Sequence, residues 1–271
     1  MSTANSIKAA AIQMVSSPIV DENLTDAAAW IQVAAQKGAR LVVLPEYFCI
    51  MGQHDTDKLV LREPPGSGPL QEFLSAQARE HGIWLVGGTI PLAIPGDERI
   101  YNSCLVFGPD GRQQARYDKI HLFGFDNGED VFSEADTIRA GENPPQMFDG
   151  PCGKVGLSIC YDLRFPEMYR AMGHVNLIVV PSAFTFTTGR AHWEILLRAR
   201  AIENQCYVLA AAQGGRHKTG RRTWGHSVLI DPWGKIIDQR PEGPGIVTGD
   251  IDLDRIERVR SALPALAHRT L

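Results

Sequence analysis

The cysteine in the segment Val155–Glu167 is the residue of this sequence best suited to chemistry. Apolar residues alternate before Cys160 as in a β-strand, and Pro166 has the fixed φ that suits the first turn of a helix. Cys160 is therefore expected between a strand and a helix, where free backbone N–H groups and the helix dipole favour the thiolate. Free cysteines are also often buried and inert, so this segment alone supports a core cysteine equally well.

Two acids and a lysine are candidates to act with this thiol. Glu46 follows the apolar run Leu41–Leu44, and a carboxylate desolvated there would have the raised pKa of a general base; a solvated loop acid is the alternative. Lys119, with the backbone N–H of Tyr161, could stabilise the oxyanion formed when a thiol attacks an amide, although most lysines are merely solvated. Glu134 would orient the lysine and the leaving group, but by itself it resembles a surface glutamate.

Arg164 is the candidate for substrate binding because it lies four positions after the cysteine. Its guanidinium could form a bidentate pair with a carboxylate near the reacting carbonyl, which predicts an acidic substrate. The alternative is a salt bridge to Asp162 or Glu167.

Composition limits the possible classes of protein. The chain has 271 residues, 44% of them hydrophobic, and we expect a single α/β domain over residues 1–271. A net charge of −4 argues against binding to nucleic acid or a membrane surface, and no apolar run is long enough to span a bilayer. The start of the sequence lacks the pattern of a signal peptide. Five irregularly spaced cysteines form no CxxC pair, so we expect no metal and no disulfide framework, and a cytoplasmic location.

Strands and helices are predicted to alternate along the chain. Helical spacing predicts helices over residues 24–35, 70–81 and 191–204, the last with an apolar stripe of Ile195, Ala199 and Ile202. The basic segment Gly214–Arg222 is predicted to be a flexible loop that is solvated or attracts an anionic substrate. Strands are predicted over residues 9–14, 41–44, 84–88, 103–107, 155–160, 177–181, 207–212, 227–230 and 246–251. This order predicts a mixed sheet system with helices outside.

Taken together, the motifs resemble the nitrilase (carbon–nitrogen hydrolase) superfamily over essentially the whole chain. They are Leu-Pro-Glu46, Tyr-Asp-Lys119-Ile-His-Leu, Glu134 and Gly-Leu-Ser-Ile-Cys160-Tyr-Asp-Leu-Arg-Phe-Pro-Glu. The resemblance implies an αββα sandwich that dimerises into a four-layer assembly. It also implies that Cys160 is the nucleophile, Glu46 the general base, Lys119 the oxyanion stabiliser and Glu134 a supporting acid, with no cofactor.

The residues after the cysteine indicate a branch of this superfamily. True nitrilases usually have Trp-Glu there, whereas this chain has Tyr161-Asp162, and residues 181–189, 191–207 and 210–217 are similar to the deaminated-glutathione amidase branch. The same resemblance makes Thr188 a second substrate contact; a helix-start residue is the alternative. We therefore expect an amidase acting on a small acidic amide through a thioester, with an ω-amidase acting on 2-oxo acid amides as the close alternative. A redox-sensing thiol protein is the alternative from another class.

Overall fold

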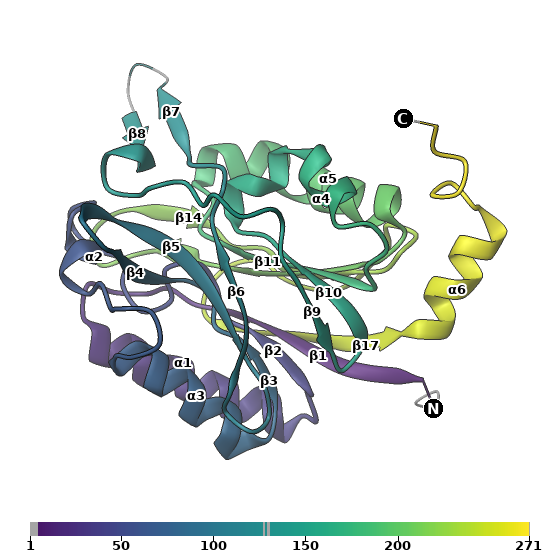
Figure 1. Cartoon of the computed structure of the whole chain (residues 1–271), viewed down its shortest axis with the longest axis horizontal. Coiled ribbons are helices and arrows are strands. Elements are labelled where there is room, and N and C mark those ends of the chain that lie inside the picture. The colour runs from purple at the N-terminus through teal and green to yellow at the C-terminus, as the bar shows by residue number, and fades with distance from the viewer. Residues whose placement is uncertain (1–4, 127, 129–130, 271) are drawn as a thin grey trace.

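Two β-sheets stacked face to face form the centre of the protein, and helices cover both outer faces (Figure 1). The computed structural model describes residues 5–126, 128 and 131–270. The layer order is helix, sheet, sheet, helix, so the predicted αββα sandwich is confirmed. One domain over residues 1–271 stays a prediction, and residues 1–4, 127, 129, 130 and 271 lie outside the described part of the chain.

The first sheet has seven strands in the order β17-β1-β2-β3-β5-β4, with β6 also paired to β5. Its strands β1, β2 and β3 run parallel, as the alternation of strands and helices predicts. The bounds are β1 (Ser6–Gln13), β2 (Leu41–Val43), β3 (Trp84–Val86), β4 (Ile90–Ile94), β5 (Asp97–Phe107), β6 (Gln113–Asp118) and β17 (Gly245–Asp252).

The second sheet has six strands in the order β16-β15-β12-β11-β10-β9. Its central strands β10, β11 and β12 are parallel, and antiparallel partners close both sides. The bounds are β9 (Met147–Gly150), β10 (Gly153–Leu157), β11 (Leu177–Ser182), β12 (Tyr207–Ala212), β15 (Ser227–Ile230) and β16 (Ile236–Arg240).

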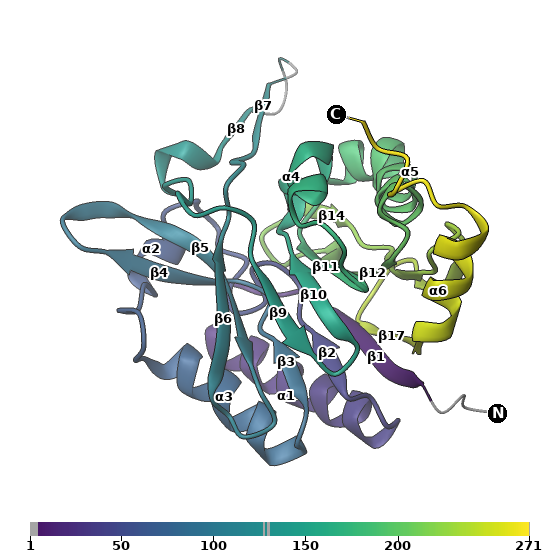
Figure 2. The same cartoon turned by 45° about the vertical axis from the view of Figure 1, so that its right-hand side comes forward.

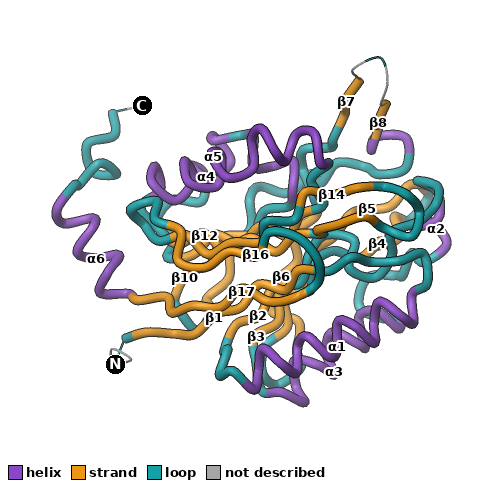
Figure 3. The backbone as a smooth tube through the Cα atoms, turned by 180° about the vertical axis from the view of Figure 1, so that it is seen from behind, coloured by secondary structure: helices purple, strands orange, loops and turns teal. Residues whose placement is uncertain are grey.

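Helices α1 and α3 lie on the outer face of the first sheet, and α4 and α5 lie on that of the second (Figure 3). The three predicted helices are present, but α5 begins five residues earlier than predicted, after the N-cap Thr185. The predicted apolar stripe of α5 is wrong as a core-facing surface, because Ile195 is 71% exposed and Ile202 is 50% exposed, whereas Trp193 and Leu197 are buried. The helix bounds are α1 (Val20–Gln36), α2 (Asp57–Val60), α3 (Pro69–His81), α4 (Pro166–Ala171), α5 (Phe186–Asn204) and α6 (Leu253–Ala262).

Strand β1 explains how the two cores are separated. Ala9 and Ala11 belong to the core between the sheets, whereas Ala10 and Ile12 face the core beneath α1 and α3. Side chains of a strand alternate between its faces, so a strand buried on both faces is apolar at every position. This is why the sequence around β1 shows a continuous apolar run.

Two short hairpins flank the sandwich. The hairpin of β7 (Gly124–Asp126) and β8 (Val131–Ser133) projects beyond the sheets (Figure 2). The hairpin of β13 (Gly214–Arg216) and β14 (Arg222–Trp224) contains the basic segment. The predicted loop is present only over residues 217–221, because Gly214–Arg216 pair as a strand with Arg222–Trp224. Lys218 and Arg222 form ion pairs with Glu22 and Glu242.

No helix in the described part of the chain is both long and apolar enough to cross a membrane.

Candidate active site

Three of the four predicted catalytic residues come from the two stacked sheets, the fourth follows the β7–β8 hairpin, and all four lie close together. Glu46 follows β2, and Lys119 follows β6 directly, both in the first sheet. Cys160 follows β10 of the second sheet and begins the short 3₁₀ helix η2 (Cys160–Arg164). Glu134 begins the 3₁₀ helix η1 (Glu134–Asp136), directly after β8.

The ammonium group of Lys119 lies between the two carboxylates. Its Nζ donates hydrogen bonds to Glu46 Oε1 at 2.9 Å and to the two Glu134 oxygens at 2.9 and 2.8 Å. The lysine side chain is 0% exposed, and the side chains of Glu46 and Glu134 are 1% and 14% exposed. Opposite charges this deeply buried hold each other in place because neither can be solvated by water.

Additional donors fix the two carboxylates. Asn102 donates a hydrogen bond to Glu46 Oε1 at 3.0 Å. Glu134 accepts hydrogen bonds from the hydroxyl of Tyr47 at 2.9 Å and from the backbone N–H of Phe123 at 2.7 Å. These bonds satisfy further acceptor positions of the two buried carboxylates.

The turn that carries Cys160 is held by a buried aspartate. Cys160 has a φ of 48°, a left-handed conformation that is uncommon for a residue with a Cβ. Asp162 accepts hydrogen bonds from the backbone N–H of Ile159 at 2.8 Å and from the hydroxyl of Tyr117 at 2.7 Å. Asp162 Oδ1 also lies 2.7 Å from Nδ1 of His121, whose ring stacks on Phe165. Surrounding contacts of this kind maintain a strained backbone at functional turns.

Burial and charge together set the pKa of each group. Burial raises the pKa of Glu46, and the nearby Lys119 offsets this only in part. Burial also acts on Glu134, but there the charge and hydrogen bonds of Lys119 dominate and the pKa is lowered. The two carboxylates outweigh burial at Lys119 and raise its pKa well above the ordinary value. The Lys119–Glu134 pair is therefore ionised, and Glu46 is the carboxyl poised to exchange a proton.

The local turn, which favours the thiolate, is only one of the influences on Cys160. Burial, followed by the negative charge of Glu46, raises the pKa of Cys160 well above its ordinary value, although Lys119 opposes this. A hydrogen bond with the thiol in turn lowers the pKa of Glu46. These shifts favour a thiol next to a carboxylate that can accept its proton.

A pocket opens onto this thiol. It encloses about 320 Å³, including space open to solvent, and Tyr161 is part of its wall, where the oxyanion contact was predicted. The lining residues are Glu46, Tyr47, Phe123, Glu134, Cys160, Tyr161, Arg164, Ala183, Phe184, Thr185, Thr188 and Arg221.

Both predicted substrate contacts line this pocket. Arg164 forms neither of the salt bridges considered as alternatives; its guanidinium lies over the rings of Tyr161 and Phe184 and contacts His192 Nδ1 at 3.2 Å. Thr188 is buried in the first turn of α5, and its hydroxyl lies 2.8 Å from that of Thr185, which is the actual N-cap.

Sequence reasoning missed several residues of this site. Tyr47 adjoins Glu46 and could have been found by position, but Asn102 lies within the long strand β5 and has no local signal. The backbone of Ala183 also contacts the Cys160 sulfur and lowers its pKa. The four other cysteines are buried and unpaired. Among the described residues, no group of three or more His, Cys, Asp or Glu could hold a metal ion.

Comparisons with known proteins agree with this geometry. The family described as carbon-nitrogen hydrolase matches residues 8–261. A deaminated glutathione amidase of Synechocystis sp. (strain PCC 6803 / GT-S) is 41% identical over 266 residues, which cover 96% of this chain and 97% of that protein. The omega-amidase NIT2 of Xenopus tropicalis is 40% identical over 262 residues, which cover 95% and 93%.

A solved structure is similar over the same length. Saccharomyces cerevisiae Nit3, a member of branch 10 of the nitrilase superfamily, is 35% identical and superposes with a TM-score of 0.85, covering 96% of this chain and 95% of that one. The resemblance predicted from the sequence motifs is confirmed. The chain belongs to the carbon-nitrogen hydrolase family.

Proposed function

We propose that this carbon-nitrogen hydrolase is an amidase that cleaves a small acidic amide through a thioester on Cys160. The observation that carries the proposal is the buried set of a thiol, an ammonium and two carboxylates beneath a pocket with an arginine. Relatives named as deaminated glutathione amidase and omega-amidase support the reaction class.

The first half of the reaction forms the thioester. Glu46 accepts the proton of the Cys160 thiol as the sulfur attacks the amide carbonyl, and this transfer removes the carboxylate charge that opposes the thiolate. The ammonium of Lys119 and the N–H of Tyr161 stabilise the negative oxygen of the tetrahedral intermediate. Glu46 then gives the proton to the nitrogen, the C–N bond breaks and the amine leaves.

The second half returns the enzyme to its resting state. Glu46, again a carboxylate, accepts a proton from water as the water oxygen attacks the thioester carbonyl. The C–S bond breaks, the acid is released and the proton returns to sulfur. Because the Lys119–Glu134 pair stays ionised throughout, one carboxyl group, Glu46, can serve both steps.

Arg164 and Thr188 are proposed to bind a carboxylate on the acyl half of the substrate. The guanidinium of Arg164 is free of carboxylate partners among the described residues and borders the same pocket as the thiol. A charge-assisted pair there would select an acidic acyl group such as a 2-oxo dicarboxylate.

A product assay separates the two amidase candidates. Purified protein is incubated with a 2-oxo dicarboxylate joined through an amide to the amino group of cysteinylglycine and, separately, with the corresponding primary amide, and the released cysteinylglycine and ammonia are measured. We expect faster release of the dipeptide and an acyl adduct on Cys160 in the intact mass, both absent in Cys160→Ala. Hydrolysis of the primary amide alone would favour the ω-amidase, and full turnover by Cys160→Ala would overturn the proposal.

The redox-sensor alternative requires a different pKa and accessibility of the same thiol. A sensor needs a low-pKa, accessible thiolate, whereas burial raises the pKa of Cys160 and leaves it 8% exposed. Glu46→Gln should abolish amide turnover, and peroxide should inactivate the wild-type enzyme no faster than it oxidises an ordinary thiol.

We also propose that the protein is a homodimer in a reducing, cytoplasmic compartment. All five cysteines are unpaired, as expected there. Ile195 and Ile202 of α5 are exposed together with Trp233, and Ile202 lies against the β15–β16 turn next to that tryptophan. Ile195→Glu should reduce the dimer fraction in light scattering, whereas Val60→Glu, on the exposed helix α2, should not. A monomeric wild-type protein would refute the dimer.

A further inference from the structure

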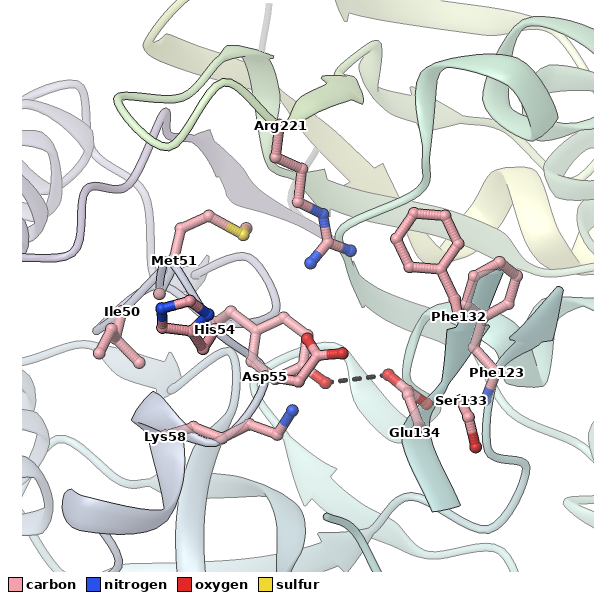
Figure 4. Close-up of a pocket in the computed structure, with 12 residues that line it drawn as sticks. Ile50, Met51, His54, Asp55, Lys58, Phe123, Phe132, Ser133, Glu134 and Arg221 are labelled. Carbon is pink, nitrogen blue, oxygen red and sulfur yellow. Dashed lines mark hydrogen bonds between the residues drawn. The ribbon is translucent and has the colours of Figure 1, made fainter. Parts of the chain in front are cut away.

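A second cavity lies next to the Cys160 pocket and continues it. We call it the outer cavity; it encloses about 530 Å³, including space open to solvent (Figure 4). Tyr47, Phe123, Glu134 and Arg221 line both spaces, whereas Cys160, Arg164 and Thr188 line only the first. The lining of the outer cavity is Tyr47, Ile50, Met51, Gly52, His54, Asp55, Lys58, Phe123, Phe132, Ser133, Glu134 and Arg221.

Two cationic side chains enter the outer cavity from different elements. Lys58 extends from α2, and Arg221 extends from the β13–β14 hairpin toward the same space (Figure 4). Lys58 Nζ lies 5.8 Å from the centroid of the Tyr47 ring, and the Arg221 guanidinium lies 5.7 Å from that of Phe132. Aromatic faces thus hold both charges in place without neutralising them.

Neither cation forms an ion pair within 4 Å with a carboxylate in the part of the chain that the structure describes. In contrast, two neighbours of Arg221 on the hairpin do form ion pairs: Lys218 lies 2.7 Å from Glu22, and Arg222 lies 3.6 Å from Glu242. The buried Nε of Arg221 also has no hydrogen-bond partner among the described residues. A buried donor of this kind usually has a partner, which a ligand atom or an ordered water can supply.

The acids around the outer cavity leave this positive charge uncompensated. Glu134 is paired with Lys119 and also accepts hydrogen bonds from the Tyr47 hydroxyl and the Phe123 N–H. Asp55 is exposed at the rim and interacts with Lys58 only through space. The interior therefore retains two positive side chains and favours a negatively charged ligand group.

We infer that the outer cavity binds the amine half of the substrate and that Lys58 and Arg221 bind a carboxylate on it. The inference rests on the proposed amidase function and deepens it. The acyl half must stay on Cys160 after the C–N bond breaks, so it occupies the pocket that the sulfur lines, and the amine half occupies the neighbouring space that the sulfur does not line. The substrate class is then an amide whose departing amine carries its own carboxylate, as a dipeptide does.

Three amides of one 2-oxo dicarboxylate test this assignment. The amine halves are glycylglycine, glycylglycine amide and ammonia, and release of the common acid is measured for each. Because kcat/KM reports the steps through release of the amine, hydrolysis of the shared thioester does not enter the comparison. The wild-type enzyme should prefer the free carboxylate to its capped amide.

Arg221→Gln and Lys58→Gln should each lower the ratio of kcat/KM for glycylglycine to that for glycylglycine amide, by about 10- to 100-fold for the arginine. Lys218→Gln is the matched control, because this lysine is on the same hairpin but is paired with Glu22 outside both pockets. Lys58 and Arg221 are on separate elements, so misfolding of one segment would not lower the ratio in both variants.

An unchanged ratio in both variants, or an equal loss for all three amides, would overturn this inference while leaving the amidase function intact. Hydrolysis of none of the three amides by the wild-type enzyme would instead overturn the proposed function.

Discussion

Replacing Lys119 by Met should expose how much the buried charge set contributes to stability and how much to catalysis. The substitution leaves the Glu46 and Glu134 carboxylates without their common cation, 2.9 and 2.8 Å away in the wild-type protein. Their side chains are 1% and 14% exposed, so water can replace the ammonium only in part. Removing one partner of such a buried pair destabilises a protein by about 3–5 kcal/mol.

The loss should depend on pH in a defined direction. Lys119 is the main influence that lowers the pKa of both carboxyls, so in Lys119→Met both pKa values rise above their unfolded values. Groups with a raised folded pKa favour folding below the unfolded pKa, and this contribution is lost as pH rises through the folded pKa. The penalty of Lys119→Met should therefore be larger at pH 8 than at pH 5.

The assay is equilibrium urea unfolding at a fixed protein concentration, combined with amide turnover. Lys119→Met/Glu134→Gln removes one uncompensated carboxylate and should recover part of the stability, because Gln can still interact with Tyr47 and Phe123. Turnover should stay at least about 100-fold down in both variants, since the oxyanion contact is lost. Lys8→Met, which breaks the exposed pair with Asp250, should cost less than about 1 kcal/mol.

Equal losses of stability in Lys119→Met and Lys8→Met would refute the reasoning about burial. Recovery of turnover in the double variant would refute the role of Lys119 in stabilising the oxyanion.

Three further predictions concern single groups of the site. Burial raises the pKa of Glu46 above its ordinary 4.5, and Glu46 acts as a base only when it is a carboxylate. We therefore expect kcat/KM to rise with pH through an apparent pKa above 4.5. A pH profile of kcat/KM whose acidic side has an apparent pKa of 4.5 would contradict this. Asp162→Asn should lower stability by about 1–3 kcal/mol and reduce turnover, because the turn at Cys160 loses a charged hydrogen-bond acceptor. The exposed Asp110→Asn variant is the control and should change neither property. Thermal unfolding and amide-hydrolysis kinetics of the two variants test this prediction. Iodoacetamide should label Cys160 before the other cysteines, because Cys160 lines a pocket and is 8% exposed, whereas the other four are at most 1% exposed. Peptide mass spectrometry that finds another cysteine labelled first would contradict this.

Much of the fold follows from local patterns, and the exceptions have tertiary causes. All nine predicted strands are present because their apolar runs are buried on one or both faces. The start of α5 was missed because threonine and glycine are weak helix formers. A Cβ at Gly189 would lie 2.2 Å from Cβ of Trp224, so close packing of the helix on β14 requires a glycine inside it. The need for glycine at this position depends on contact with Trp224, so it could not be predicted from the local sequence.

The residues of the site likewise fall into those that a local sequence pattern predicts and those whose roles depend on tertiary contacts. Placement of Glu46 and Cys160 after apolar strands could be predicted, because strand ends are where exposed chemistry meets a rigid scaffold. The balance of influences on Cys160 could not be predicted, since the local turn favours the thiolate while burial and Glu46, from another sheet, favour the thiol. Asn102 was likewise invisible, because its role depends on a residue distant in sequence. Arg221, in contrast, belongs to the basic segment that was predicted to be solvated or to attract an anionic substrate.

The proposed chemistry depends on the packing of one sheet on the other. The first sheet supplies Glu46 and Lys119, and the second supplies Cys160, so neither sheet alone contains both a nucleophile and its base. Ala9 and Ala11 of β1 lie in the core between the sheets, where a larger side chain would push them apart. Proton transfer requires hydrogen-bond distance between the thiol and Glu46, and a separation of even about 1 Å can reduce a rate 100-fold. Small residues in that core are therefore as necessary to the proposed reaction as the residues that perform it.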